Sequence, residues 1–242
     1  MNDHELAAAL ATRAGRLLLE VRTEFADATA EDRKAAGDAR SHEFLMEQLA
    51  AARPGDAVLS EEAADDPIRL RSSRVWIVDP LDGTREFSEL GRADWAVHVA
   101  LWSDGELIAG AVALPAQGVT LATPDVPALP PPPAVPRIVV SRTRPPAVAL
   151  RVRDALGGTL VEMGSAGAKV AAVVQGLAEV YVHAGGQYEW DSAAPVAVAR
   201  AAGLHTSRID GSALQYNQRD LLLPDLLVCR PHYADAALAA LR

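Results

Sequence analysis

The stretch Val75–Thr84 has the sequence VWIVDPLDGT, in which four apolar residues run into two aspartates, a proline and a glycine. Consecutive apolar residues are typical of a strand covered on both faces, so we expect Val75–Val78 to lie in the middle of a sheet. The strand is expected to end at Asp79, and a helix to open after Gly83. The intervening turn can direct both carboxylates and the Leu81 carbonyl toward the same point.

Helical and strand patterns surround this stretch in the first half of the chain. Apolar residues at helical spacing predict one helix over residues 5–24 and a second helix that begins after Asp38. A short strand, Ala57–Leu59, is expected to lead directly into Glu61-Glu62. Two apolar runs that flank a Ser-Asp-Gly-Glu turn predict a β-hairpin over residues 95–114.

A proline-rich segment divides the chain. The run Pro130–Pro133 predicts a stiff, extended connector over residues 126–136, between an N-terminal α+β half (1–125) and a C-terminal α/β half (137–242). A ligand for an SH3-type domain is the alternative interpretation of this run. Strands and helices are expected to alternate beyond it, with strands at 138–141, 160–163, 179–183 and 226–229 and helices at 146–156, 166–175, 192–202 and 234–241. This alternation predicts an α/β fold.

Composition and charge limit the function classes. The 242 residues are 50% hydrophobic and carry a formal net charge of −9, which argues against nucleic-acid binding. Residues 1–125 hold 12 Arg/Lys against 23 Asp/Glu, so the acidity belongs to the first half, as a cation site or as a solvated acidic surface. No apolar run is long enough for a membrane span, and the chain starts without a signal peptide, so we expect a cytoplasmic protein. A single cysteine, Cys229, excludes an internal disulfide.

Three acidic motifs are candidates for chemistry. Glu61-Glu62 and Asp79-Pro80-Leu81-Asp82 each follow an expected strand, and Glu189-Trp190-Asp191 precedes an expected helix. Strand ends direct side chains into a shared crevice, and clustered carboxylates repel one another unless a cation joins them. Hard oxygen ligands suit Mg²⁺, and the lack of histidines near the motifs argues against zinc. The alternative for Asp79–Thr84 is a strand-to-helix loop with a capping aspartate and glycine.

These motifs resemble those of the lithium-sensitive, magnesium-dependent phosphatases, which include inositol monophosphatases, fructose-1,6-bisphosphatases and bisphosphate nucleotidases. The family pattern is matched here by Asp38, Glu61-Glu62, Asp79–Thr84 and Trp190-Asp191-Ser192-Ala193. Three shorter motifs are most similar to those of actinobacterial CysQ-type 3′(2′),5′-bisphosphate nucleotidases. They are Arg85-Glu86-Phe87, Ser141-Arg142-Thr143 and Gly164–Lys169. The resemblance implies a layered α/β/α/β/α sandwich with the site between the two halves.

The resemblance also implies a metal site and a catalytic pair. Two or three Mg²⁺ ions are expected, with Glu61, Asp79, the Leu81 carbonyl, Asp82 and Asp191 as ligands and Asp79 bridging two of the ions. Two metals clamp the attacking and leaving oxygens of an in-line displacement. Glu61 therefore serves catalysis as a ligand. Thr84, hydrogen-bonded to Asp38, is expected to accept or orient the proton of the attacking water.

Substrate contacts follow from the same comparison. The residues implied are Gly83, Thr84, Arg142, Gly164, Ser165, Lys169 and Glu189. Lys169 is one of only two lysines and lies in the first turn of an expected helix, where backbone N–H groups also bind phosphate. A solvated lysine, a structural Arg142 and a capping Glu189 are the alternatives. His98, His183 and His205 are expected to be structural.

The function implied is removal of the 3′-phosphate of 3′-phosphoadenosine 5′-phosphate (PAP), giving AMP and phosphate, within sulfur assimilation. The 5′-phosphosulfate analogue (PAPS) is a further expected substrate. Activity on inositol phosphates or on fructose 1,6-bisphosphate is the alternative within the family, and a catalytically dead nucleotide sensor is the alternative outside it. Relatives of this kind are lithium-sensitive and are often homodimers, so both properties are expectations here.

Overall fold

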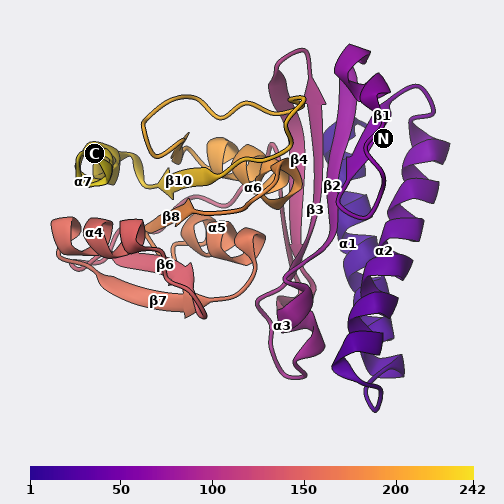
Figure 1. Cartoon of the computed structure of the whole chain (residues 1–242), viewed down its shortest axis with the longest axis horizontal. Helices are drawn as coiled ribbons and strands as arrows, with labels where there is room; N and C mark the ends of the chain where they lie inside the picture. Colours follow the sequence, from indigo (N-terminus) through magenta and orange to yellow (C-terminus); the bar gives the residue numbers. More distant parts are fainter.

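The computed structural model describes all 242 residues and arranges them in five layers, as Figure 1 shows. An outer pair of helices, α1 (Asp3–Glu24) and α2 (Ala30–Ala52), covers the first sheet. A middle pair, α5 (Ala166–Val174) and α6 (Glu189–Ala201), separates this sheet from the second one. The last pair is α4 (Ala147–Leu156) and α7 (Ala234–Leu241). The predicted α/β/α/β/α sandwich is therefore confirmed.

Each sheet has five strands. The first has the order β1-β2-β3-β4-β5, built from β1 (Ala57–Ser60), β2 (Arg74–Asp82), β3 (Ala96–Ser103), β4 (Glu106–Leu114) and β5 (Val119–Ala122). The second has the order β7-β6-β8-β10-β9, built from β6 (Arg137–Ser141), β7 (Thr159–Met163), β8 (Val180–Ala184), β9 (His205–Ser207) and β10 (Asp225–Cys229). Three 3-10 turns, η1 (Pro67–Arg71), η2 (Pro115–Gln117) and η3 (Pro231–Tyr233), complete the set with helix α3 (Thr84–Ser88).

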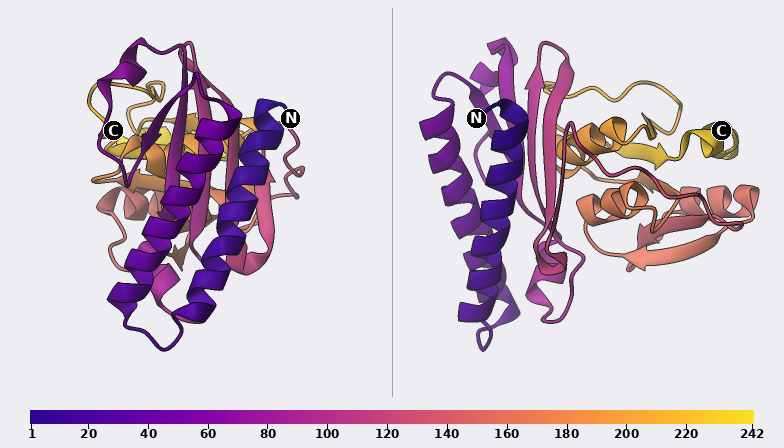
Figure 2. Two further views of the ribbon diagram at one scale, coloured as in Figure 1. Left: turned by 90° about the vertical axis from the view of Figure 1, so that its right-hand side faces the viewer. Right: turned by 180° about the vertical axis from the view of Figure 1, so that it is seen from behind.

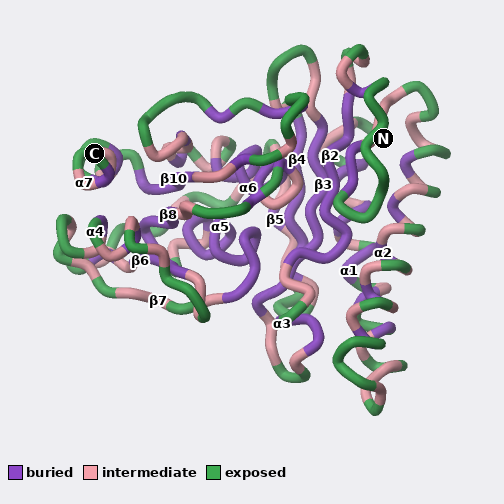
Figure 3. The backbone as a smooth tube through the Cα atoms, in the orientation of Figure 1, coloured by how far each residue is buried: buried purple, intermediate pink, exposed green.

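The first sheet is buried on both faces because helices cover each of them. Helix α1 packs on β3 and β4 from outside, and α6 packs on β2, β3 and β4 from inside. Figure 2 shows α1 and α2 side by side on the outer face, and Figure 3 shows the buried strands beneath them. Fully burying a leucine contributes about 1.5–3 kcal/mol, and α1 buries Leu6, Leu10 and Leu18 along one face.

Two helix starts differ from the predictions. Helix α2 begins at Ala30, so Asp38 lies inside it rather than before it. The extra turns are capped by Thr29, whose side chain accepts a hydrogen bond from the Asp32 N–H, and they are too polar to show an apolar period. Helix α6 begins at Glu189, which places the Glu-Trp-Asp motif in its first turn rather than ahead of it.

Strand β2 also differs, because it continues through Pro80 to Asp82 instead of ending at Asp79. Its pairing with β3 shifts register between Asp79 and Asp82, so the residue without an N–H falls where the ladder is interrupted. Strands β5 and β9 were not predicted, since four and three residues give too short a pattern. No helix combines the length and apolar character that crossing a membrane requires.

Candidate active site

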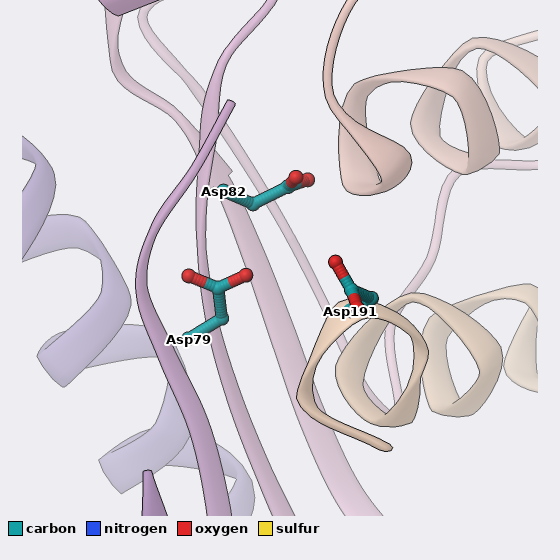
Figure 4. A group of neighbouring side chains, drawn as sticks. All are labelled: Asp79, Asp82 and Asp191. Carbon is teal, nitrogen blue, oxygen red and sulfur yellow. The ribbon is translucent and has the colours of Figure 1, made fainter. Parts of the chain in front are cut away.

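Three aspartates converge where the two halves meet. Asp79 and Asp82 come from β2, and Asp191 comes from the first turn of α6. Each offers a carboxylate oxygen, and these oxygens all lie within 4.8 Å of one another. Figure 4 shows the three side chains directed toward a common point between strand and helix. The arrangement brings together three predicted ligands and could hold a metal ion.

The bulge in β2 explains how two aspartates of one strand reach the same point. The Leu81 N–H donates to Asp79 Oδ1 at 3.0 Å, which fixes the first carboxylate. From the outer layer, Ser41 Oγ donates to the Pro80 carbonyl at 2.7 Å and holds the irregular backbone in place. Side chains three residues apart in a regular strand would point to opposite faces, whereas the register shift here aligns them.

Asp79 carries the greatest electrostatic strain of the three. Burial raises the pKa of its carboxyl well above the usual value, and the charges of Glu61, Asp82 and Asp191 raise it further. Carboxylates held this close favour a cation that neutralises them. Because the donors are all oxygens, the set fits a hard divalent cation rather than a thiolate- or imidazole-preferring metal.

Asp82 is instead well stabilised as an anion. It accepts hydrogen bonds from Ser165 Oγ at 2.5 Å, from the Ala166 N–H at 3.0 Å and from the Gly167 N–H at 2.5 Å, all at the start of α5. Burial acts to raise the pKa of Asp82, but the opposing effects of His98 and of the Ser165 hydrogen bond hold this pKa at about 2. The N-terminus of a helix is a favourable place for negative charge.

Two glycines allow the halves to approach closely beside Asp82. Gly83 has a φ of 82°, and a Cβ there would lie 2.9 Å from the Cβ of Ser165. A Cβ on Gly164 would lie 2.2 Å from side-chain atoms of Glu86. Both glycines therefore serve packing at the boundary between the halves, and contact with a substrate phosphate stays a prediction for them and for Ser165.

Asp38 and Thr84 lie near each other, and their catalytic role stays a prediction. Asp38 projects from α2 toward Thr84, and burial together with the charge of Glu62 raises the Asp38 pKa to about 7 against a lowering hydrogen bond with Thr84. The Thr84 hydroxyl also lies 3.2 Å from the Leu81 carbonyl, to which it donates. Thr84 thus links Asp38 to the carbonyl that was predicted to be a metal ligand.

Glu61 stands at the solvent side of the triad. Its N–H donates to the Val78 carbonyl at 3.4 Å, and its side chain hydrogen-bonds with that of Asp79. Burial and the charge of Asp191 raise the pKa of Glu61 to about 7, although solvent reaches the residue and weakens both effects. Glu61 is not one of the residues within 4.8 Å of one another, so its ligand role stays a prediction.

Lys169 and Arg142 are already engaged by polar groups of the protein. The Lys169 ammonium is buried and donates to the carbonyls of Gly164, at 3.2 Å, and Ser165. Arg142 forms ion pairs with Glu86 at 2.7 Å and Glu89 at 2.6 Å. Arg142 therefore offsets carboxylates of the N-terminal half, while Lys169 binds carbonyls of its own half, and a contact with substrate stays a prediction for each.

Glu189 is turned toward a loop of the C-terminal half. Its buried carboxylate accepts the N–H groups of Asn217 at 2.6 Å and Gln218 at 2.7 Å. Burial raises the Glu189 pKa to about 7 against these two hydrogen bonds. The residue also lines a cavity of about 350 Å³ with Arg208, Gln215 and Gln218. Its predicted contact with a sugar remains untested by this geometry.

His98, which was expected to be structural, lies beside the acidic triad in space although it is distant from the motifs in sequence. Its Nε2 lies 3.2 Å from Asp82 Oδ2, and its Nδ1 is 3.0 Å from the Trp190 carbonyl. Strand pairing places it opposite Asp79. A polar residue in the apolar strand WAVHVALW was the available signal, because the predicted hairpin already placed that strand near Val75–Val78.

Replacing Gly167 with alanine is expected to displace His98. The new Cβ would lie 1.9 Å from His98 Nε2, and such overpacking in a rigid interior costs about 1–3 kcal/mol. Thermal unfolding and phosphatase activity should therefore both decline. Gly55→Ala is the matched control, because a Cβ at Gly55 meets nothing within 4 Å. Equal stability of the two variants would contradict the close approach of α5 to His98.

Comparisons with known proteins agree with this geometry. The sequence model described as "Inositol monophosphatase family" matches residues 2–125 and 138–242. The chain is 55% identical over 237 residues to the 3′-phosphoadenosine 5′-phosphate phosphatase of Mycobacterium tuberculosis, covering 94% of this chain and 89% of that one. It is 32% identical over 202 residues to the 3′(2′),5′-bisphosphate nucleotidase CysQ of Escherichia coli, covering 78% and 81%. The crystal structure of inositol monophosphatase II from Staphylococcus aureus shares the fold, with a TM-score of 0.82, 20% identity and coverage of 98% and 92%.

Proposed function

The chain belongs to the inositol monophosphatase family, and from this premise we propose that it is a magnesium-dependent phosphatase that converts PAP to AMP and phosphate, with PAPS as a second substrate. The observation that carries the proposal is the acidic triad at the boundary between the halves. The extent of identity to a PAP phosphatase supports the choice of substrate.

We propose that the triad holds the metal together with Glu61 and the Leu81 carbonyl. Asp79 would be the shared ligand, because its buried carboxyl lies within the influence of the charges of Glu61, Asp82 and Asp191. Mg²⁺ at this point supplies positive charge that activates water and neutralises the charge developing on the phosphate. Asp82 reaches the metal already ionised, because the start of α5 stabilises its negative charge.

The protein's own catalytic groups then act on the attacking water. Thr84 Oγ1 accepts or orients a water proton, and Asp38 receives the hydroxyl's hydrogen bond and fixes its direction. The Leu81 carbonyl competes for the same hydroxyl proton in the structure. In the resting arrangement the Thr84 hydroxyl donates to the Leu81 carbonyl, and in the proposed reactive arrangement it donates to Asp38. A rotation of the Thr84 side chain converts one arrangement into the other.

We propose that the substrate binds across the boundary between the N-terminal and C-terminal halves. Gly83, Ser165 and the start of α5 approach the scissile phosphate, while Glu189 faces the sugar. Lys169 and Arg142 provide positive charge for the second phosphate. Arg142 donates to Glu86 through Nε and to Glu89 through Nη2, which leaves Nη1 for a substrate oxygen.

Side-by-side phosphate release from PAP, inositol 1-phosphate and fructose 1,6-bisphosphate with Mg²⁺ tests the proposal. We expect kcat/KM for PAP to exceed the other two by at least about tenfold, a difference of about 1.4 kcal/mol in transition-state binding. Omission of Mg²⁺, with EDTA present, is expected to abolish release from all three. Equal or higher activity on a sugar phosphate would overturn the substrate assignment while leaving the metal site in place.

A further inference from the structure

Arg69 is a completely buried arginine that the proposed reaction does not use. It lies in η1, eight residues after Glu61, and its side chain is 0% exposed. The guanidinium binds Asp65 through two contacts of 2.6 and 3.1 Å. It also donates to Asn217 Oδ1 at 2.8 Å and to the Gln218 carbonyl at 2.9 Å.

Asn217 continues the connection to the active site. Its Nδ2 donates back to the Arg69 carbonyl at 3.1 Å, so the two residues hold each other in both directions. The backbone N–H groups of Asn217 and Gln218 end on the carboxylate of Glu189. Glu189 opens α6, the helix whose first turn carries Asp191. A continuous hydrogen-bonded path thus runs from Asp65 to the helix that bears a metal ligand.

The Glu61 N–H is fixed to the Val78 carbonyl of β2, whereas the residues that follow Glu61 reach the C-terminal half through this path. Residues 61–68 are all exposed to solvent. The other hydrogen bonds of residues 62–71 are local, such as Ala63 N–H to the Ser60 carbonyl and Ser72 Oγ to the Ile68 carbonyl. The hydrogen bonds between residues 62–71 and the C-terminal half all pass through Arg69.

We propose that Asp65, Arg69, Asn217 and Glu189 form a latch between the two halves, and that Arg69 is a positioning residue for the metal site. The latch keeps the Glu61 segment against the C-terminal half, so that Glu61 and Asp191 keep a fixed separation around Asp79, the ligand that the proposed cations share. This inference rests on the proposed function in one respect, since it takes Glu61 as a ligand. The fork of the guanidinium suits the task, because one side chain meets a carboxylate, an amide and a carbonyl at once.

Three variants test the latch. Arg69→Met removes the donors and keeps an unbranched apolar side chain. Asn217→Gly removes the amide partner while keeping the backbone conformation, since Asn217 has a φ of 58° that glycine adopts freely, and it retains the N–H to Glu189. Arg71→Met is the matched control, because Arg71 is exposed and two residues away in the same turn.

Hydrogen exchange of the metal-free protein gives the first readout. Amides of residues 61–71 should exchange about tenfold faster in Arg69→Met and in Asn217→Gly than in the wild type or in Arg71→Met, with the sheets unaffected. Calorimetry gives the second, in which Mg²⁺ affinity should fall about 10-fold or more in both latch variants, as for other groups that orient metal ligands. The double variant should be no worse than Arg69→Met, because both changes break one path.

The kcat values distinguish an effect on the position of the metal ligands from a general loss of folded structure. At saturating Mg²⁺ the latch variants should regain most of the wild-type kcat, while the Mg²⁺ concentration for half-maximal rate stays raised. Unchanged Mg²⁺ affinity in Asn217→Gly, with or without faster exchange, would overturn the proposal even if Arg69→Met failed to fold. If PAP were not hydrolysed by the wild type, the exchange and calorimetry results would still decide the latch, since neither uses the substrate.

Discussion

Asp79→Asn is expected to lower kcat/KM by about four orders of magnitude, corresponding to about 5 kcal/mol of lost transition-state stabilisation. The Asp79 carboxyl is buried among the charges of Glu61, Asp82 and Asp191, so the substitution removes the ligand that we propose the cations share. Asparagine keeps the shape and the oxygen that accepts the Leu81 N–H, so folding is not at risk. The loss should therefore appear in turnover and in Mg²⁺ affinity together.

The same substitution is expected to raise the Tm of the metal-free protein. The pKa of Asp79 is higher in the folded protein than in the unfolded chain, so ionising it at neutral pH opposes folding. Asparagine cannot ionise and therefore removes this penalty. In the wild type the penalty is fully present when the pH is above the pKa of Asp79 in the folded protein, and it disappears when the pH falls below the pKa of Asp79 in the unfolded chain. Mg²⁺ should reverse the order, because it stabilises the wild type and binds the variant poorly.

Thermal unfolding in EDTA and in Mg²⁺, with phosphate release from PAP, checks both halves of this prediction. Asp27→Asn is the control, because Asp27 is an exposed aspartate in the turn between α1 and α2. It should leave the Tm and the rate unchanged. A lower Tm for Asp79→Asn in EDTA, or a rate within tenfold of the wild type, would show that the three carboxylates do not share one cation.

The acidic triad could be predicted from the sequence because each aspartate stands in a short motif with its own local signal. A strand, a proline turn and a glycine predicted that Asp79 and Asp82 would be neighbours. The family resemblance, rather than any local rule, joined them to Asp191 more than a hundred residues away. The resemblance also implied the five layers, whereas the order of elements by itself predicted only an α/β fold.

The partners of the cations could not be predicted in this way. Arg142 and Lys169 were expected to bind a substrate phosphate, because they carry positive charge in a half of the chain that is slightly basic. The structure shows that carboxylates and carbonyls of the protein contact these cations. The two carboxylates that bind Arg142 are separated from it by 53 and 56 positions in the sequence. The partners of Arg69 and His98 were not predicted for the same reason. A lone cation or imidazole has no periodic pattern in the sequence that indicates which residue it contacts.

Asp38 illustrates a third kind of error, in which the residue was right and its element was wrong. Its helix starts at Ala30, well before the apolar pattern begins, because the first turns of α2 bury Arg33 and Gly37 rather than apolar side chains. This matters for function, because a side chain inside a helix of 23 residues is held more firmly than one in a preceding loop. The helix therefore holds Asp38 beside Thr84 before any substrate binds.

Asp38→Asn is expected to reduce kcat by about 10²–10⁴, the usual contribution of a positioned proton acceptor, while KM for PAP changes little. In the proposed reactive arrangement the carboxylate accepts the hydrogen bond of Thr84, and an amide would accept it less strongly and could not take up charge as the water loses its proton. Mg²⁺ affinity should stay near the wild-type value, because Asp38 is not among the clustered ligands. This separates it from Asp79→Asn, in which rate and affinity fall together.

Thr84→Val and the double variant complete the test. Valine has the shape of threonine without its hydroxyl, so it should cost as much as Asp38→Asn, and the double variant should cost no more than either because the two groups act as a unit. Glu43→Gln, an exposed change on the same helix, should be silent. Additive losses would mean that Asp38 and Thr84 act separately, with Thr84 serving through the Leu81 carbonyl to which its hydroxyl donates in the structure. The pair would then not be the route by which the water loses its proton.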